Sequence, residues 1–253
     1  MLLRERYESQ GQLFFRWRSY WPYLLLPLLA GALSGSGGFE QQFGESAEFA
    51  WDIFCIVFAL VGAGVRIATV GFVPGGTSGR NTREQRAEHL NTTGIYSVVR
   101  NPLYVGNIIT LIAFALATKV WWFPPIIAAL ALLFYERVIF TEEAFLLEKF
   151  GKPYVEWSGR TPALVPRLRN WYRPDIPFSL RAAIRREYHG VFLIVVVLTA
   201  IEFLTDLVGE GESLADWFQE GNFWNYLLGF SLGLYFVIRW IRKRTSWLVV
   251  EGR

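Results

Sequence analysis

Apolar residues gather in long blocks along the chain, and short polar or basic connections separate them. A helix needs about 20 apolar residues to cross the roughly 30 Å hydrocarbon core of a bilayer. Six blocks are candidates: Trp21–Leu33, Ala50–Phe72, Leu103–Thr118, Trp121–Phe140, Gly190–Val208 and Phe223–Ile241. The pattern predicts an all-α fold, a polytopic membrane helix bundle with about six transmembrane helices.

The third and fourth blocks are separated only by Lys119 and Val120, which predicts a tight antiparallel hairpin. Pro124 and Pro125 fit the first turn of the fourth helix, where a missing backbone N–H costs little. The last block contains Gly229 and, four residues later, a second glycine. This small-xxx-small spacing is typical of helix packing in membranes.

Composition supports a membrane protein and excludes several other classes. The chain of 253 residues is 53% hydrophobic and only 19% charged, whereas an ordinary soluble domain has about 25% charged residues. Its single cysteine, Cys55, excludes an internal disulfide, and we read it as a buried, inert thiol. With only two histidines besides, we expect no zinc or haem site. We find no nucleic-acid-binding signature.

Charge orients the predicted bundle. The segments before the first block, between residues 74 and 101, between 141 and 189, and after 239 are rich in Lys and Arg, whereas segments 34–49 and 209–222 have none. Cytoplasmic connections carry this excess of positive charge. We therefore expect six spans in a bacterial inner membrane with both termini in the cytoplasm, although Lys119 breaks the pattern. Cleavage of the first block as a signal peptide is the alternative.

The connection after the second block has the residues of an anion site. Gly75, Gly76 and Gly79 allow tight turns with exposed backbone N–H groups. Asn101 stands where a helix cap belongs, and Pro102 fits the first helical position. The positive end of the third helix would then favour an anionic group. The alternative is an ordinary, well-capped helix.

Ionisable residues inside spans are costly in lipid, so they usually face a cavity or a partner. Glu136 and Arg137 lie near the inner end of the fourth block, and Glu202 lies in the fifth. For Arg137 and for Arg66 in the second block, the alternative is that the side chain extends to the lipid headgroups. Glu202 needs a partner.

The motifs "HLNTTGIYSVVRNPLYVGN", a hairpin, "TEEAFLLEKFGKPYVEW" and "TPALVP" follow one another between about Glu88 and Pro166. In order and spacing they resemble the isoprenylcysteine carboxyl methyltransferase family and its phospholipid methyltransferase relatives. The resemblance implies a membrane bundle that binds S-adenosylmethionine at its cytoplasmic side. It implies these cofactor-binding residues: Glu88, His89, Leu90, Asn91, Tyr96, Asn101, Pro102, Leu103, Tyr104 and Glu143. Asn101 replaces the family's histidine, and it cannot titrate.

For the chemistry, the resemblance points to Arg137 as the substrate arginine, at a spacing displaced by a residue or two. Glu142 is the local candidate for a general base, which an amine acceptor would need. We therefore expect three parts: residues 1–73 with two spans, a methyltransferase core at 74–170, and an extension at 171–253 with two further spans. No obligate protein partner is indicated.

The expected reaction is methyl transfer from S-adenosylmethionine to a membrane lipid or lipid-linked substrate. Arg80, Arg83 and Arg86 favour an anionic headgroup, and relatives of the resembled family methylate a lipid A phosphate. Isoprenylcysteine-type carboxyl methylation is also open. Two other classes remain: a nicotinamide-dependent membrane lipid or sterol reductase of related fold, and a non-enzymatic membrane scaffold.

Overall fold

The computed structural model describes residues 3–36, 38–75, 87–211, 213–219 and 223–253. The regular elements of its described part are helices, joined by loops, with an isolated bridge between Gly94 and Tyr172. The elements up to the central hairpin are α1 (Leu3–Trp17), the 3₁₀ turn η1 (Trp21–Leu25), α2 (Leu26–Leu33), α3 (Phe39–Phe43), α4 (Glu45–Gly71), α5 (Ile95–Val98) and α6 (Pro102–Ala117). The remaining elements are α7 (Phe123–Phe150), α8 (Lys152–Arg160), η2 (Leu168–Asn170), α9 (Leu180–Leu204), the π-helical turn η3 (Thr205–Glu210), α10 (Leu214–Gln219) and α11 (Phe223–Arg244).

Three helical segments of the described chain are long and apolar enough to cross a membrane: Glu45–Gly71, Phe123–Phe150 and Leu180–Gly209. Two shorter apolar helices cover Trp21–Leu33 and Pro102–Ala117. The expected all-α membrane bundle is therefore confirmed in its class. The predicted sixth span folds as the helix α11, but it is not among these apolar segments, so the count of six stays a prediction.

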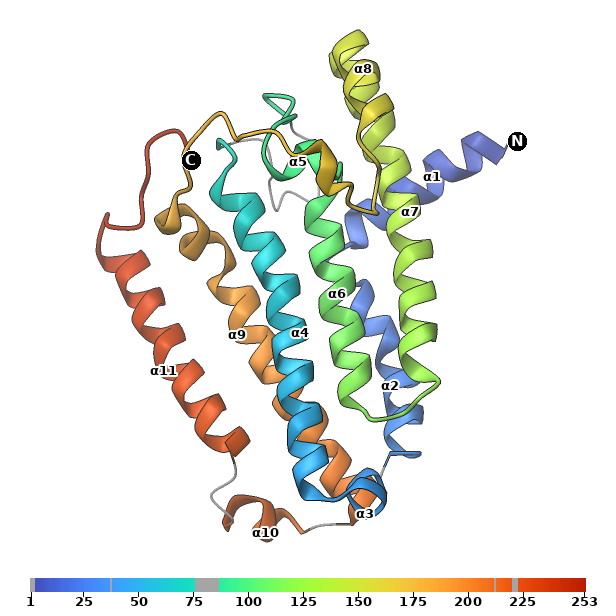
Figure 1. Ribbon diagram of the computed structural model, residues 1–253, viewed down its shortest axis with the longest axis vertical. Coiled ribbons are helices and arrows are strands. Elements are labelled where there is room, and N and C mark those ends of the chain that lie inside the picture. Colours follow the sequence, from blue (N-terminus) through green and yellow to red (C-terminus); the bar gives the residue numbers. More distant parts are fainter. Residues whose placement is uncertain (1–2, 37, 76–86, 212, 220–222) are drawn as a thin grey trace.

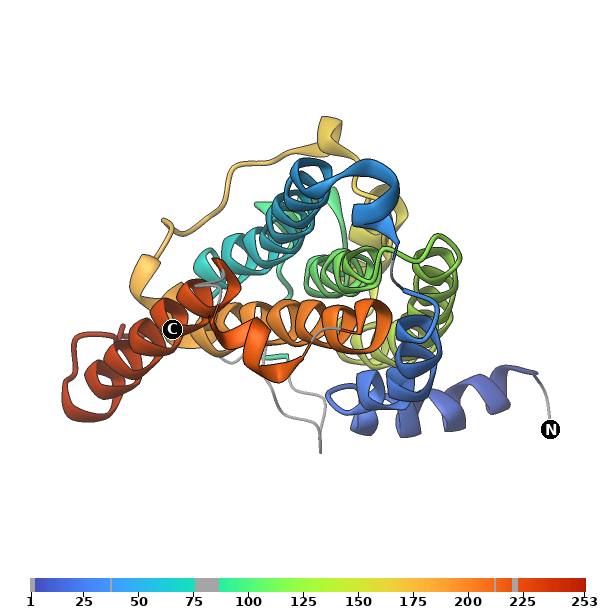
Figure 2. The ribbon, with the colours of Figure 1, turned by 90° about the horizontal axis from the view of Figure 1, so that it is seen from below.

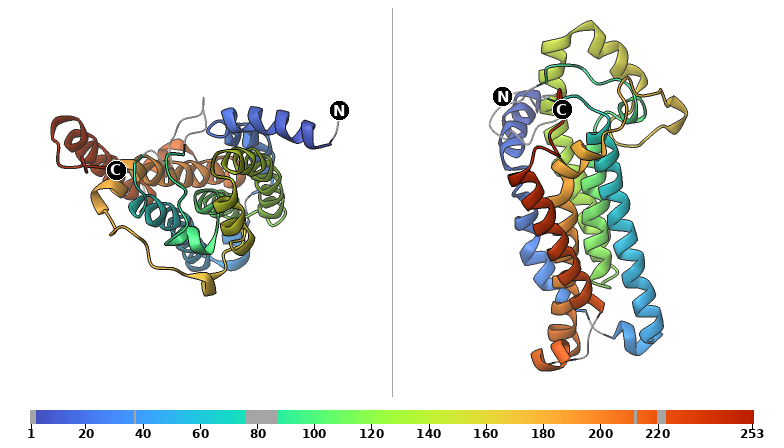
Figure 3. Two further views of the ribbon diagram at one scale, coloured as in Figure 1. Left: turned by 90° about the horizontal axis from the view of Figure 1, so that it is seen from above. Right: turned by 90° about the vertical axis from the view of Figure 1, so that its left-hand side faces the viewer.

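The helix α1 and the C-terminal residues lie at the same end of the bundle, together with α5 and α8 (Figure 1), and the side view in Figure 3 agrees. We call this the terminal end. The α3 and α10 helices and the turn between α6 and α7 lie at the opposite end. This placement is compatible with the predicted shared side of the two termini, whereas which side faces the cytoplasm stays a prediction.

A four-helix core forms the centre of the molecule. α4 packs on α6 and α9, and α6 also packs on α7, as the view along the bundle in Figure 2 shows. α11 packs on the outer side of α9. α4 and α6 approach each other closely: a Cβ on Gly62 would lie 2.6 Å from the Gly106 carbonyl oxygen. Glycine at both positions lets these backbones touch.

The glycine pair predicted to pack in α11 is different. A Cβ on Gly229 or Gly233 would meet nothing within 4 Å. The pair therefore packs on no other helix of the described chain, and a role in helix packing stays a prediction.

The N-terminal segment contributes an unpredicted helix. α1 packs against α7, where the rings of Phe14 and Phe134 stack with centroids 5.1 Å apart. Trp21 of η1 also stacks on Phe134, with ring centroids 4.5 Å apart. These aromatic contacts hold α1, η1 and α2 beside α7, so the N-terminal elements form one wall of the space between α7 and α9.

The two charged residues that sequence left without partners meet at the opposite end. The Lys119 ammonium lies 3.1 and 3.2 Å from the two carboxylate oxygens of Glu202. It also pairs with Asp52 at 3.5 Å and with Glu48. Burial disfavours the charge on Lys119, but the three carboxylates outweigh burial and raise the pKa of the ammonium. Lys119 therefore ties α4 and α9 to the α6–α7 turn.

Candidate active site

The motif segment at the terminal end is held in place by the connection that follows α8. Gly94 donates its N–H to the Tyr172 carbonyl at 2.9 Å, and Arg100 donates its own to Pro162 at 2.9 Å. Gly94 has φ +60°, a conformation that glycine adopts without steric cost. These two bonds hold the backbone on either side of α5 against the connection that follows α8.

Asn101 occupies the N-cap position of α6 and Pro102 the first helical position, as predicted. The Asn101 side chain, however, does not cap the helix. Its Nδ2 donates to the Ala163 carbonyl at 3.1 Å. Asn101 therefore clamps the "TPALVP" segment to the start of α6, and the expectation of a side-chain cap is wrong.

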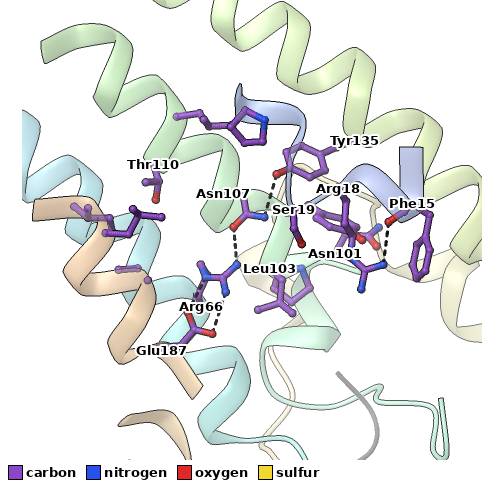
Figure 4. Close-up of a pocket in the computed structure, with 18 of the residues that line it drawn as sticks. Phe15, Arg18, Ser19, Arg66, Asn101, Leu103, Asn107, Thr110, Tyr135 and Glu187 are labelled. Atoms are coloured by element: carbon purple, nitrogen blue, oxygen red, sulfur yellow. Dashed lines mark hydrogen bonds and ion pairs between the residues drawn. The ribbon is translucent and has the colours of Figure 1, made fainter. Parts of the chain in front are cut away.

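A cavity of about 750 Å³ opens beside this segment. It runs between the N-terminal elements, α6, α7 and α9 (Figure 4). At the terminal end its walls are polar and aromatic, with His89, Asn91, Tyr96 and Arg100 among them. Deeper in the bundle the walls become apolar. They include Leu29, Leu111, Phe114, Phe123, Ile127, Val191, Ile194 and Val197.

Most of the predicted site residues line this cavity. The structure brings together His89, Leu90, Asn91, Tyr96, Asn101, Pro102, Leu103, Tyr104 and Glu142. Three others lie outside its lining. Glu88 is exposed, Glu143 is ion-paired to Arg100 at 2.9 Å, and Arg137 pairs with Glu136 at 3.4 Å. Glu143 thus reaches the cavity only through Arg100, and the structure does not bring Arg137 to it.

Glu142 and the two motif tyrosines form the polar wall on the α7 side. The Tyr104 hydroxyl donates to Glu142 Oε1 at 2.9 Å, and the ring of Tyr104 stacks on Tyr135 with centroids 4.7 Å apart. Burial, with the nearby Glu142 carboxylate, raises the pKa of Tyr96, so its hydroxyl stays protonated at neutral pH. The wall offers hydroxyl and carboxylate groups beside aromatic faces.

Arg100 is a cavity residue that sequence reasoning treated only as part of the basic loop. Its Nη1 donates to the Ser158 carbonyl at 2.8 Å, and its Nη2 pairs with Glu143. Its Nε is buried and has no hydrogen-bond partner among the described residues. A buried donor without a partner is costly, whereas the parts of Arg100 that line the cavity carry its positive charge to the cavity wall.

A second polar group lies one turn deeper and was also missed. Arg66 does not extend to the headgroups, as the sequence alternative allowed. It pairs with Glu187 of α9 at 2.8 Å and donates to Asn107 at 2.6 Å, as drawn in Figure 4. Asn107 in turn donates to the Tyr135 hydroxyl at 3.1 Å. An arginine inside a span was the available signal, but its partner lies 121 residues further on.

The structure describes only part of the predicted anion loop. Gly76, Gly79 and the arginines at 80, 83 and 86 lie outside the described residues. Among the described residues, no group of three or more His, Cys, Asp or Glu side chains could hold a metal ion.

Comparison with known proteins connects this site to a family. Residues 55–153 match the phospholipid methyltransferase family model. The chain is 34% identical over 122 residues to the cobalt-zinc-cadmium resistance protein CzcN of Cupriavidus metallidurans. This alignment covers 47% of the present chain and 53% of the relative. It is 37% identical over 95 residues to protein-S-isoprenylcysteine O-methyltransferase B of Arabidopsis thaliana, covering 32% of this chain and 43% of the relative.

A further relative is the protein-S-isoprenylcysteine O-methyltransferase of Schizosaccharomyces pombe, with 27% identity over 164 residues, 59% of this chain and 67% of the relative. The chain spans about half the length of the first two metal-resistance relatives it matches, 53% and 55%. No solved structure matches. The resemblance read from the motifs is confirmed: residues 55–153 match the phospholipid methyltransferase family, and the chain is related to membrane methyltransferases of the isoprenylcysteine and phospholipid type.

Proposed function

We propose that this protein transfers a methyl group from S-adenosylmethionine to the headgroup of a membrane lipid, at the terminal end of the bundle. One observation carries the proposal. A single cavity is lined at one end by the motif residues of a methyltransferase family and at the other by apolar side chains of α2, α6, α7 and α9. A polar cofactor and a lipid chain therefore have adjoining places.

The residues at the terminal end fit the cofactor. Its carboxylate would lie near the positively charged Arg100 side chain in the cavity wall and the positive end of α6. Tyr96 and Tyr104 would pack around its body, where a cation also gains from an aromatic face. Glu88 and Glu143, implied by the family resemblance, would act from outside the cavity wall, Glu143 by holding Arg100.

When bound, S-adenosylmethionine supplies a methyl group whose bond to sulfur breaks with the electron pair staying on sulfur. An anionic oxygen acceptor loses no proton in forming its bond to that carbon, so the chain needs to align it rather than deprotonate it. An amine acceptor would lose one, and Glu142 is the carboxylate in the cavity wall that could take it. Arg137 pairs with Glu136 instead. A role for Arg137 at the substrate stays a proposal, and its position outside the cavity lining does not favour it.

The lipid would enter from the side of the bundle. Tyr23, Leu26 and Leu193 line the cavity and are themselves exposed. The cavity therefore opens outward between η1–α2 and α9, through side chains compatible with hydrocarbon. We propose that the membrane is a bacterial inner membrane, that the terminal end is cytoplasmic, and that the headgroup is anionic, as a lipid phosphate such as that of lipid A would be.

Mass spectrometry of total lipids, with and without the gene, tests the proposal. We expect one lipid class to lose a single methyl group when the gene is deleted, and Asn101→Ala to reproduce the loss. An unchanged lipid profile would contradict methyl transfer. Tight NADPH binding with no response to S-adenosylmethionine would favour a lipid reductase instead. A non-enzymatic scaffold predicts that Asn101→Ala and Glu143→Ala leave every phenotype intact.

A further inference from the structure

Four residues of the cavity wall form one hydrogen-bonded chain: Glu187 of α9, Arg66 of α4, Asn107 of α6 and Tyr135 of α7. Arg66 Nε and Nη2 donate to the two carboxylate oxygens of Glu187, at 2.8 and 3.0 Å. Asn107 accepts from Arg66 and donates to Tyr135. We call these four residues the headgroup layer.

The position of the layer follows from the spacing along α6. Leu103, Asn107, Thr110 and Phe114 all line the cavity. At a rise of about 1.5 Å per residue, Asn107 lies about 6 Å deeper than Leu103, and Phe114 about 10 Å deeper again. The cofactor motif lies on one side of the layer and the apolar channel on the other. A lipid headgroup with its chains in the channel would therefore meet this layer.

Hydrogen-bond accounting shows what the layer can bind. Arg66 has five N–H donors, and three are used. The Tyr135 oxygen accepts from Asn107 and from Trp21 Nε1 at 3.4 Å, so its own O–H has no acceptor among the described residues. Both oxygens of Glu187 accept from Arg66, and both amide atoms of Asn107 are bonded. The hydrogen atoms left without an acceptor in the described part of the chain are two N–H of Arg66, one N–H of Asn107 and the Tyr135 O–H, whereas every acceptor oxygen of Glu187 and Asn107 already takes one N–H from Arg66 and keeps only its second lone pair.

We infer that Arg66 and Tyr135 bind an anionic oxygen of the lipid headgroup, and that Glu187 of α9 positions Arg66 for that contact. The inference rests on the proposed function and adds to it the residues that recognise the substrate. A carboxylate or a phosphate monoester would satisfy the unused donors of the layer. A protonated amine has no lone pair for these donors, carries the same charge as Arg66, and would find only the second lone pairs of oxygens already bonded to Arg66.

The inference also gives α9 a role. Glu187 lies outside residues 55–153, the segment that matches the family. Its carboxylate grips Arg66 with two parallel bonds, which fixes the plane of the guanidinium. It also offsets a charge that is costly to bury alone. The stem of Arg66 packs directly on the backbone of Gly106, where there is no room for a side chain: a Cβ added to Gly106 would lie 2.7 Å from Arg66 Cγ. α9 thus completes the substrate site.

The test measures lipid binding to the purified, full-length protein by native mass spectrometry. The probes are phosphatidic acid, an S-farnesylcysteine carboxylate, the long-chain amine sphingosine and neutral diacylglycerol. We expect phosphatidic acid or the carboxylate to bind at least about tenfold more tightly than sphingosine and diacylglycerol, a difference of about 1.4 kcal/mol. The two anionic probes distinguish a phosphate from a carboxylate. Preference for sphingosine would overturn the inference.

Variants separate recognition from a merely structural ion pair. Arg66→Lys keeps the charge but loses the planar fork, so we expect the favoured anionic lipid to bind about tenfold more weakly. The swap R66E/E187R keeps an ion pair between α4 and α9 but moves the guanidinium. We expect the swap to be more thermally stable than either of its single substitutions, R66E or E187R, but to bind the anionic lipid no better than they do. Tyr188→Phe is the matched control, because it removes an acceptor for Arg242 on the outer side of α9 and should leave lipid binding unchanged.

Two results would overturn the inference: anionic lipid binding within about twofold of wild type in both Arg66→Lys and Arg66→Gln, or full recovery of lipid affinity in the swap. If the swap does not fold, the two single variants decide. Failure of methyl transfer itself would look different. It would leave the lipid-binding differences in place while S-adenosylmethionine binding or label transfer is absent in wild type.

Discussion

Lys119 offers the sharpest test of how the bundle is held together. Its side chain is only 2% exposed, and those of Asp52 and Glu202 are 6% and 9% exposed. Lys119→Met keeps the length of the side chain but leaves three carboxylates facing one another in a buried place. Removing one partner of a buried ion pair costs about 3–5 kcal/mol, because the other charge stays behind without compensation.

Although three carboxylates lose their partner, the loss of stability should not be three times that value. Once the ammonium is gone, the carboxylates can take up protons, which relieves their repulsion and limits the cost. For a chain of this size, about 1 kcal/mol shifts the melting temperature by about 2–4 °C. We therefore expect Lys119→Met to melt about 6–20 °C below wild type. Heating in detergent, followed by circular dichroism, measures it.

Three further variants control for other causes. Lys149→Met removes an exposed lysine near the end of α7 and should change stability by less than about 0.5 kcal/mol. Lys119→Gly removes the cost of a left-handed residue at φ +61°, about 1–2 kcal/mol, yet should still destabilise. Glu202→Gln added to Lys119→Met should recover part of the loss. Melting of Lys119→Met within about 2 °C of wild type would refute the reasoning.

The remaining predictions concern the cavity. Gly106→Ala places a Cβ 2.7 Å from both Arg66 Cγ and the Gly62 carbonyl oxygen, so we expect a loss of about 1–3 kcal/mol on thermal unfolding together with weaker lipid binding. Arg100→Gln removes the ion pair with Glu143 and the unpartnered buried Nε. Calorimetry should show S-adenosylmethionine binding weakened by about tenfold, about 1.4 kcal/mol, with lipid binding unchanged. Arg137→Gln should change the transfer rate by less than about twofold, since this side chain lies outside the cavity lining; a rate near zero would restore its catalytic interpretation.

Much of the fold could be predicted from the sequence because membrane helices are encoded by long apolar blocks. The hairpin between Ala117 and Phe123, with its prolines in the first turn of α7, is where the pattern placed it. α1 was missed because polar and charged residues interrupt its sequence, and it lies against α7 through a few aromatic rings rather than an apolar block. α7 continues ten residues past the predicted end at Phe140, because helical residues extend beyond the apolar part.

The candidate site was predicted where residues are close in sequence and missed where they are not. Tyr96, Asn101 and Tyr104 could be found because one short motif contains them. The pair of Arg66 and Glu187 could not, since it joins α4 to α9 and only the packing of α4 on both α6 and α9 brings the charges together. Lys119 looked like an exception to the charge rule. It is buried among carboxylates and therefore carries no information on orientation.

The most direct test of the central claim is transfer of label from methyl-labelled S-adenosylmethionine to lipid by the purified wild-type protein. The single cavity predicts that label appears in an anionic lipid fraction, and that Leu111→Trp, which would fill the apolar channel, abolishes the transfer while S-adenosylmethionine still binds. Absence of label from every lipid fraction, with the cofactor bound, would contradict the account.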